Sequence, residues 1–147
     1  MNQMKSDFPG SKSGIILRNL VSRLVCDSQA AAIQLKTIII NEVPAGMHVL
    51  AEEPTISPVI AELLSTVVAN SNKGRIFISA ERFRDMIIFH VQDRNNYNGY
   101  ALAYSIKSME PLANSLGGFI TIKGQQQLET TISLGIPTHL GVPRYDC

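Results

Sequence analysis

The fold of this 147-residue chain is decided by residues 57–93, which read SPVIAELLSTVVANSNKGRIFISAERFRDMIIFHVQD. Ser57 can accept an orphan helix N–H and Pro58 has no N–H to lose, so this pair predicts a helix start. One side of the predicted helix is apolar at helical spacing, through Val59, Ile60, Leu63, Leu64, Val67 and Val68. The opposite edge carries Glu62, Thr66 and Ala69.

Two strands follow the helix. Residues 72–74, Asn-Lys-Gly, stop it, because asparagine and glycine suit the backbone of a helix end. Apolar, β-branched and aromatic residues over 75–80 and 86–92 predict two strands joined by a charged turn at 81–85. Asp93 ends the second strand, so the stretch is predicted to form a helix, a turn and a hairpin with an aspartate at its end.

Composition excludes several classes of function. A hydrophobic content of 45% supports a buried core in a single domain. A net charge of +1 and 6% aromatic residues leave no basic footprint for nucleic acid. Two cysteines far apart give neither a metal spacing nor a disulfide framework, which favours a reducing cytoplasm. No apolar run approaches the roughly 20 residues of a membrane span, so we expect no membrane partner.

The N-terminal half adds one helix and two short strands. Residues 1–13 mix Lys, Ser, Gly and Pro without periodicity and are predicted to be a flexible leader. Three- and four-residue apolar steps predict a helix from Ile15 to near Asp27, which the Ala-rich segment 28–34 could extend. The strands are expected at residues 37–41 and 47–51.

The C-terminal half is predicted to close the sheet with a last helix and a hairpin. The helix has an apolar stripe at Met109, Leu112, Ala113 and Leu116. The hairpin pairs residues 119–123 with 128–136, and residues 138–147 are expected to be a loose tail after a domain spanning residues 14–137. The fold class is therefore an α/β two-layer sandwich, in which a mixed, mostly antiparallel sheet of about five strands carries about three helices on one face.

The helix, turn, hairpin and terminal aspartate resemble the central unit of histidine-kinase-type ATPase domains, the GHKL or Bergerat-fold superfamily. The helix motif of those domains, Asn-Leu-x-x-Asn-Ala-x-Lys, falls here on residues 62–69, which read Glu-Leu-Leu-Ser-Thr-Val-Val-Ala. In gyrases and heat-shock chaperones the first position is a glutamate that activates water, so the resemblance implies a catalytic role for Glu62. Thr66 stands where the family has its magnesium-holding asparagine, which implies a magnesium contact through water.

The family continues with Asp-x-Gly-x-Gly, where this chain reads Asp-Arg-Asn-Asn-Tyr over residues 93–97. The resemblance implies that the Asp93 carboxylate accepts a hydrogen bond from the adenine amino group of ATP. Both glycines are replaced, and Asn95 occupies the first of their positions. Asparagine tolerates a left-handed backbone, so a turn is preserved while the space beside it narrows.

In the family, a later helix starts with Gly-Leu-Gly-Leu, and the triphosphate lies at the N-terminus of that helix. Counting back from Gly117 places this motif at residues 103–106, so that Ala103 and Ser105 become the implied phosphate contacts. A second register begins the motif at Gly99 and requires an insertion in the helix. In the first register only ten positions separate Asp93 from Ala103, where the family carries a much longer lid.

Three hypotheses about function remain open. The first is a two-component signal-transduction module with a degenerate nucleotide site that binds a protein partner: a kinase, a response regulator, a phosphoacceptor domain or a second copy of itself. The second is an ATP- and Mg²⁺-dependent kinase or ATPase subunit that transfers phosphoryl to a partner protein, as one half of a split kinase. The third is an unrelated α/β domain with a chance match. None of His48, His90 and His139 has the sequence context of a phosphoacceptor, so a self-contained histidine kinase is excluded.

Overall fold

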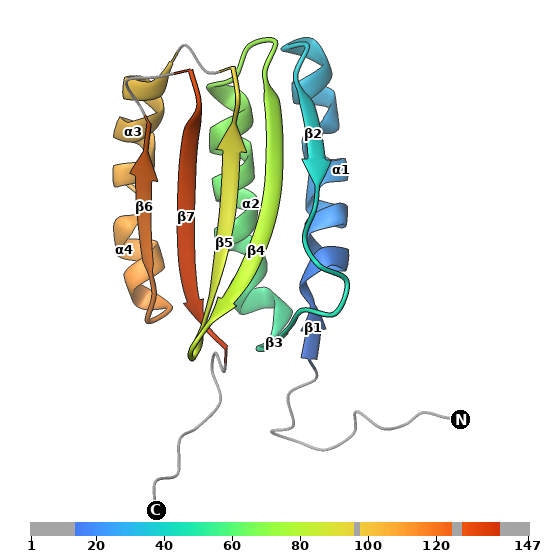
Figure 1. Ribbon diagram of the computed structural model, residues 1–147, viewed down its shortest axis with the longest axis vertical. Helices are drawn as coiled ribbons and strands as arrows, with labels where there is room; N and C mark the ends of the chain where they lie inside the picture. The colour runs from blue at the N-terminus through green and yellow to red at the C-terminus, as the bar shows by residue number, and fades with distance from the viewer. Residues whose placement is uncertain (1–13, 96–97, 125–127, 139–147) are drawn as a thin grey trace, which may run out of the picture.

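The computed structural model describes residues 14–95, 98–124 and 128–138. A five-stranded sheet forms one layer, and the helices form a second layer behind it, leaving the front face of the sheet without helices (Figure 1). The elements are, in chain order, β1 (Gly14–Ile16), α1 (Leu17–Gln34), β2 (Ile38–Asn41), β3 (His48–Leu50), α2 (Glu53–Ala69), β4 (Arg75–Phe83), β5 (Met86–Asp93), α3 (Gly99–Lys107), α4 (Glu110–Ser115), β6 (Phe119–Lys123) and β7 (Thr130–Pro137).

The strands of the main sheet lie in the order β2-β4-β5-β7-β6. β2 runs parallel to β4, and the other three neighbouring pairs are antiparallel. β1 and β3 form a separate antiparallel pair. The predicted fold class, a two-layer sandwich with a mixed, mostly antiparallel five-stranded sheet, is confirmed.

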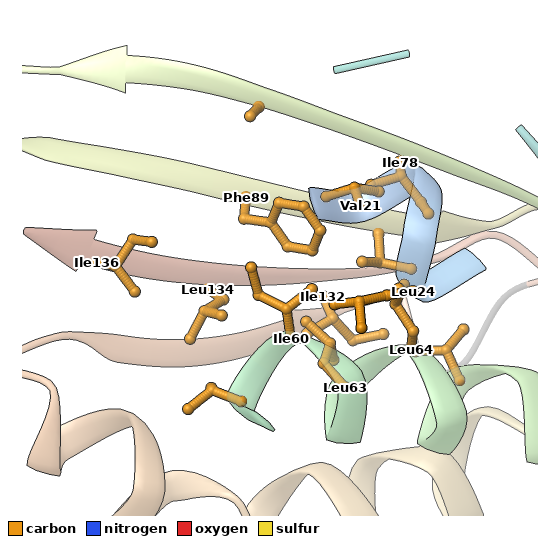
Figure 2. Close-up of a cluster of buried hydrophobic side chains, with 14 of the residues drawn as sticks. Val21, Leu24, Ile60, Leu63, Leu64, Ile78, Phe89, Ile132, Leu134 and Ile136 are labelled. Atoms are coloured by element: carbon orange, nitrogen blue, oxygen red, sulfur yellow. The ribbon is translucent and has the colours of Figure 1, made fainter. Parts of the chain in front are cut away.

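The core lies between the sheet and the helices. On β5, Ile87, Phe89 and Val91 are fully buried on the helix side, while Ile88 and His90 point to the uncovered face. This alternation follows from the two-residue repeat of a strand and places one whole face of β5 in the core. Figure 2 shows the cluster in which Phe89 meets side chains of α1, α2, β4 and β7: Val21, Leu24, Ile60, Leu63, Leu64, Ile78, Ile132, Leu134 and Ile136.

The predicted start of α2 is wrong by one turn, although its apolar stripe is buried as expected. The helix begins at Glu53, with Pro54 in its first turn, and Pro58 lies inside it. Pro54 meets the same requirement that had suggested Pro58, because a proline in the first turn has no intrahelical N–H to lose. Pro58 removes one backbone hydrogen bond, but the buried stripe continues on both sides of it through Ile56 and Val59.

Helix α1 is shifted relative to its prediction. Ile15 and Ile16 belong to β1, and the helix runs through the Ala-rich segment to Gln34. Its C-terminal half is held by Ala32, which is completely buried against the rest of the fold. The Ala-rich segment 28–34 therefore extends the helix.

Two helices replace the single one expected after β5. α3 ends at Lys107 and α4 begins at Glu110. Pro111 explains the break, since it has no N–H to donate to the carbonyl of Lys107 and its ring would clash with that carbonyl in a continuous helix. Met109 and Ala113 are buried as predicted, but Leu112 is 39% exposed, so that part of the predicted stripe is wrong.

Thr138, the residue after β7, is packed into the fold. Its N–H donates to the carbonyl of Asp85 at 2.8 Å, and its carbonyl accepts from the N–H of Leu50 at 3.0 Å. Thr138 is accordingly 5% exposed. The remainder of the predicted tail and the predicted leader lie outside the described residues.

Replacing Phe89 with alanine should destabilise the protein by about 3–5 kcal/mol, because the ring fills the centre of the core and leaves a cavity when it is removed. Phe83 is 59% exposed at the hairpin end, so Phe83→Ala is the matched control and should cost less than about 1 kcal/mol. Urea unfolding followed by circular dichroism measures both values. Equal losses in the two variants would contradict this assignment of the core.

Candidate functional site

The aspartate that the sequence analysis placed at the end of a hairpin is Asp93, the last residue of β5. It is completely buried and lies opposite Ile76 of β4 on one side and Thr130 of β7 on the other. Thr130 is also completely buried, although the sequence analysis did not identify it. Only the strand register reveals this residue, because a threonine at a strand start has no distinctive sequence signal.

Asp93 belongs to a buried polar cluster at the corner where β2, α2, β4 and β5 meet. Its Oδ1 accepts a hydrogen bond from the N–H of Asn95 at 3.2 Å. The Thr37 hydroxyl donates to Ser71 Oγ at 3.1 Å and accepts from the N–H of Gly74 at 3.3 Å. Thr37 and Ser71 are 5% and 2% exposed, so the chain itself surrounds this group of polar atoms.

Gly74 makes this close packing possible. A Cβ atom at this position would lie 2.5 Å from Oδ1 of Asp93 and would also overlap Ser71 Oγ. The preceding residue, Lys73, takes a left-handed backbone with φ 56° and donates its N–H to the carbonyl of Leu35 at 2.8 Å. The predicted turn after α2 is therefore both a helix end and one wall of the Asp93 environment.

Two asparagines tie the segment after Asp93 to the end of α2. Asn95 Nδ2 donates to the carbonyl of Lys73 at 3.0 Å, and Asn98 Nδ2 donates to the carbonyl of Asn70 at 3.1 Å. α3 begins at once, at Gly99, which is itself buried. Asn95 thus lies beside Asp93, as the resemblance implied, and its amide bonds to the protein backbone.

Glu62 lies apart from this corner. It is exposed and lines a cavity of about 270 Å³ between α1 and α2, together with Leu24 and Asp27. Along α2 it is separated from Asn70 by eight residues, a rise of about 12 Å. The fold therefore does not bring Glu62 to the Asp93 cluster.

Thr66 is half-buried, and its carbonyl accepts from both the N–H and the Nδ2 of Asn70, at 3.3 and 2.9 Å. Magnesium prefers an octahedral set of oxygen ligands that usually includes a carboxylate. Within the described segments, no group of three or more His, Cys, Asp or Glu side chains is arranged to hold a metal ion. A single threonine hydroxyl does not fit the ligand set that ATP-bound magnesium requires from a protein.

The two residues implied as phosphate contacts lie inside α3. The helix begins at Gly99, so the register that starts it at Ala103 is wrong and the second register, from Gly99, agrees with the structure. Ala103 lines a cavity of about 260 Å³ with Ile120 and Ile122 of β6. Ser105 is half-buried in the last turn of the helix, and neither residue lies at a helix N-terminus.

A larger cavity, of about 580 Å³, lies at the opposite end of α2 from Asp93. Its floor is formed by apolar residues of β1 and the first turns of α1 and α2, and the ion pair of Arg23 with Glu53 borders it. The 17 residues of α2 separate the two ends by about 25 Å. This cavity is therefore distinct from the buried corner at Asp93.

Two of the three histidines lie on strands, as predicted. His48 is in β3 and His90 is in β5. His139, Asn96, Tyr97 and Cys147 lie outside the described residues. No helix in the described segments is long and apolar enough to cross a membrane.

Solved structures with the same fold are catalytic domains of histidine kinases. Acinetobacter baumannii histidine kinase AdeS matches with a TM-score of 0.72 at 14% identity, over 90% of this chain and 70% of that one. The nucleotide-free catalytic domain of histidine kinase ThkA matches with a TM-score of 0.67 at 15% identity, over 86% of this chain and 95% of that one. ThkA in complex with the response regulator TrrA matches over 86% of this chain and 42% of that one, at 16% identity with a TM-score of 0.66.

No protein-family model matches the sequence, and no curated protein matches it. The fold of histidine-kinase catalytic domains, expected from the arrangement of the helix, hairpin and aspartate, is confirmed. At identities of 10–16% the likeness is one of fold.

Replacing Gly74 with alanine should destabilise the protein by about 1–3 kcal/mol, because the added methyl group overlaps Asp93 and Ser71. Gly46→Ala is the matched control, since a Cβ at Gly46 meets nothing within 4 Å and should change stability by less than about 0.5 kcal/mol. Thermal and urea unfolding of both variants give the comparison. A Gly74→Ala protein as stable as Gly46→Ala would show that the corner is looser than described.

Proposed function

We propose that this chain is a cytoplasmic signal-transduction module that keeps the fold of a histidine-kinase catalytic domain, holds no nucleotide and acts by binding a protein partner. The observation that carries the proposal is the environment of Asp93. This carboxylate is completely buried and hydrogen-bonded within its own chain. A carboxylate that reads adenine must instead present an oxygen to the ligand.

The segment after Asp93 supports the same conclusion. Asn95 and Asn98 bond to the backbone at the end of α2 and tie the segment after Asp93 to that helix. Opening a path would break both amide contacts, each worth about 1 kcal/mol, and would expose buried polar atoms. Only five residues, Arg94 to Asn98, connect β5 to α3, so little chain is available to form a lid.

The chemistry of the remaining candidate residues also favours binding over catalysis. Glu62 is exposed between α1 and α2, away from Asp93, and Thr66 offers one hydroxyl in place of an amide carbonyl. Phosphoryl transfer depends on positioning and on charge neutralisation by magnesium. Within the described segments no group of acidic or histidine side chains forms a metal-ligand set, and Ala103 and Ser105 lie inside α3, which begins at Gly99.

The outer surface of α3 is the best candidate for the partner site. Tyr100 is 66% exposed and Tyr104 is 83% exposed. They are four residues apart on one helix and therefore lie on the same side of it. Exposed tyrosines are enriched among the residues that contribute most to protein interfaces.

The partner we propose is another component of a two-component pathway: a kinase, a response regulator or a phosphoacceptor domain. The similar kinase ThkA was solved with the response regulator TrrA bound, which shows that a protein containing this fold can pair with such a component. A second copy of the chain remains a candidate. A split kinase would use the same surface to meet the chain that carries its phosphoacceptor.

A second candidate function is ATP binding for phosphoryl transfer to a partner protein. It is favoured by one observation, the retention of a buried aspartate at the end of β5 beside a glycine where an added Cβ would overlap it. In that function Asp93 would accept from adenine after the Asn98 contact had opened. The two functions differ in whether free nucleotide binds.

Calorimetric titration with ATP and with ADP, each with and without magnesium, tests the proposal. We expect no binding tighter than about 1 mM, which corresponds to about 4 kcal/mol. A dissociation constant of about 50 μM or tighter, lost in Asp93→Asn and kept in Asp85→Asn, would overturn the proposal in favour of ATP binding. Asp85 is the matched control because it is exposed in the hairpin turn between β4 and β5.

The partner site is tested by a photo-cross-linking amino acid placed at position 104 or, as a control, at position 83. Both positions carry exposed aromatic residues, on α3 and at the end of β4. Cross-linking in cells should give a discrete protein adduct from position 104 and none from position 83. Adducts of equal yield at both positions would contradict the assignment of the partner site to α3.

A further inference from the structure

The uncovered face of the sheet carries a chain of three hydrogen-bonding side chains from three adjacent strands. His90 of β5 is bonded to Ser133 of β7 on one side and to Glu81 of β4 on the other. His90 and Ser133 face each other directly in the register of β5 and β7. The strand register places all three on the sheet face opposite Ala80, Phe89 and Leu134 of the core. This is the face without helices (Figure 1).

For a neutral His90 ring, the distances and the chemistry of the groups define the direction of the hydrogen bonds. His90 Nε2 lies 2.8 Å from Glu81 Oε2, and His90 Nδ1 lies 2.9 Å from Ser133 Oγ. A carboxylate accepts hydrogen bonds and does not donate them, so Nε2 carries the proton and Nδ1 of the neutral ring is the acceptor. The Ser133 hydroxyl must therefore donate to Nδ1, which leaves its oxygen lone pairs free.

We propose that Ser133 is a nucleophile, activated by His90 as general base with Glu81 as the positioning residue, that accepts the acyl group of activated carboxylic esters. The same order of roles, hydroxyl to imidazole to carboxylate, activates serine in unrelated hydrolases and is recognised by geometry and not by sequence order. In those hydrolases Nε2 of the histidine faces the serine and Nδ1 faces the carboxylate. In this chain Nδ1 of His90 faces Ser133 and Nε2 faces Glu81. The inference is independent of the proposed partner binding.

The reaction balances without a cofactor. Ser133 Oγ forms a bond to the ester carbonyl carbon while its proton moves to Nδ1 of His90, and Glu81 stabilises the imidazolium through Nε2–H. The bond to the leaving oxygen then breaks, and His90 returns the proton to that oxygen. Water attacks the acyl-serine in the same way, with His90 taking its proton, and the free carboxylic acid and Ser133 are restored.

The surroundings of Ser133 set the substrate class. Thr121 of β6 lies directly opposite Ser133 in the register, on the side away from His90, so its hydroxyl is placed to donate to an oxyanion. The backbone around Ser133 lies in the middle of the sheet between β5 and β6 and is used for strand pairing, so it supplies no oxyanion donor. Loss of one oxyanion donor typically costs a factor of about 10²–10³, so only esters with a good leaving group, such as aryl esters, should react.

Accessibility is adequate for a small acyl donor. The His90 side chain is 27% exposed and that of Glu81 is 64% exposed, and Ser133 is half-buried between its neighbours. The three residues lie on strands of a rigid sheet, which holds their relative positions better than loops would. Ser79 lies opposite His90 on β4, on the same face of the sheet, and serves as the control serine because His90 Nδ1 is bonded to Ser133 instead.

The test uses the full chain with p-nitrophenyl acetate, following release of p-nitrophenolate and mapping the acetylated residue by mass spectrometry. We expect acetylation of Ser133, complete loss of that signal in Ser133→Ala, and an unchanged rate in Ser79→Ala. His90→Gln should lower the acylation rate by about 10²-fold or more, the usual contribution of a general base. Glu81→Gln should also lower it, with partial recovery in Glu81→Asp.

Thermal unfolding of each variant separates loss of chemistry from loss of fold. Ser133→Ala and Glu81→Gln should remain folded, because both residues lie on the sheet face that no helix covers and neither belongs to the buried core. Two results would overturn the proposal: acetylation of folded wild-type protein confined to lysine or to Ser79, or a Ser133 acylation rate in folded His90→Gln equal to that of the wild type.

Discussion

A buried carboxylate has no water to bond to, so its hydrogen bonds must come from the protein. For Asp93 they come from the corner where β2, α2, β4 and β5 meet. The corner meets this need with the N–H of Asn95 and closes around the carboxylate with Gly74, Ser71 and Thr37. The end of α2, the starts of β2 and β4 and the end of β5 are fixed by these contacts. The position of α3 follows, because the chain leaves Asp93 through two asparagines bonded to the residues after α2.

The structure therefore combines a fold shared with histidine-kinase catalytic domains and a corner whose polar groups bond mainly to one another. A ligand site needs convergent polar groups that remain available. At this corner the polar groups of Thr37, Ser71 and Gly74 are bonded among themselves. The exposed tyrosines lie on the outer side of α3, the helix that begins next to this corner. The proposed function, in which the fold is kept and nucleotide binding is lost, follows the rule that function resides in a site and not in a fold.

Local patterns in the sequence predicted the layers, the strands and the stripe of α2, because these depend on periodicity within one element. They predicted the start of α2 less well, since Pro54 and Pro58 satisfy the same local preference, and they placed α3 incorrectly because its first register was counted from a distant glycine pair. Asp93 was identified as the leading site residue, but its burial depends on Gly74 and Ser71, which only the folded chain brings to it. The alignment of Glu81, His90 and Ser133 likewise depends on strand register across three strands and has no signal within any one of them.

The most direct test of the central claim, that the chain itself occupies the space where adenine would be read, is a crystal structure grown with a non-hydrolysable ATP analogue and magnesium in millimolar excess. The account predicts an unliganded corner, with Asp93 Oδ1 bonded to the N–H of Asn95 and the Asn98 amide on the carbonyl of Asn70. Electron density for an adenine ring hydrogen-bonded to Asp93, with α3 displaced from the end of α2, would contradict it.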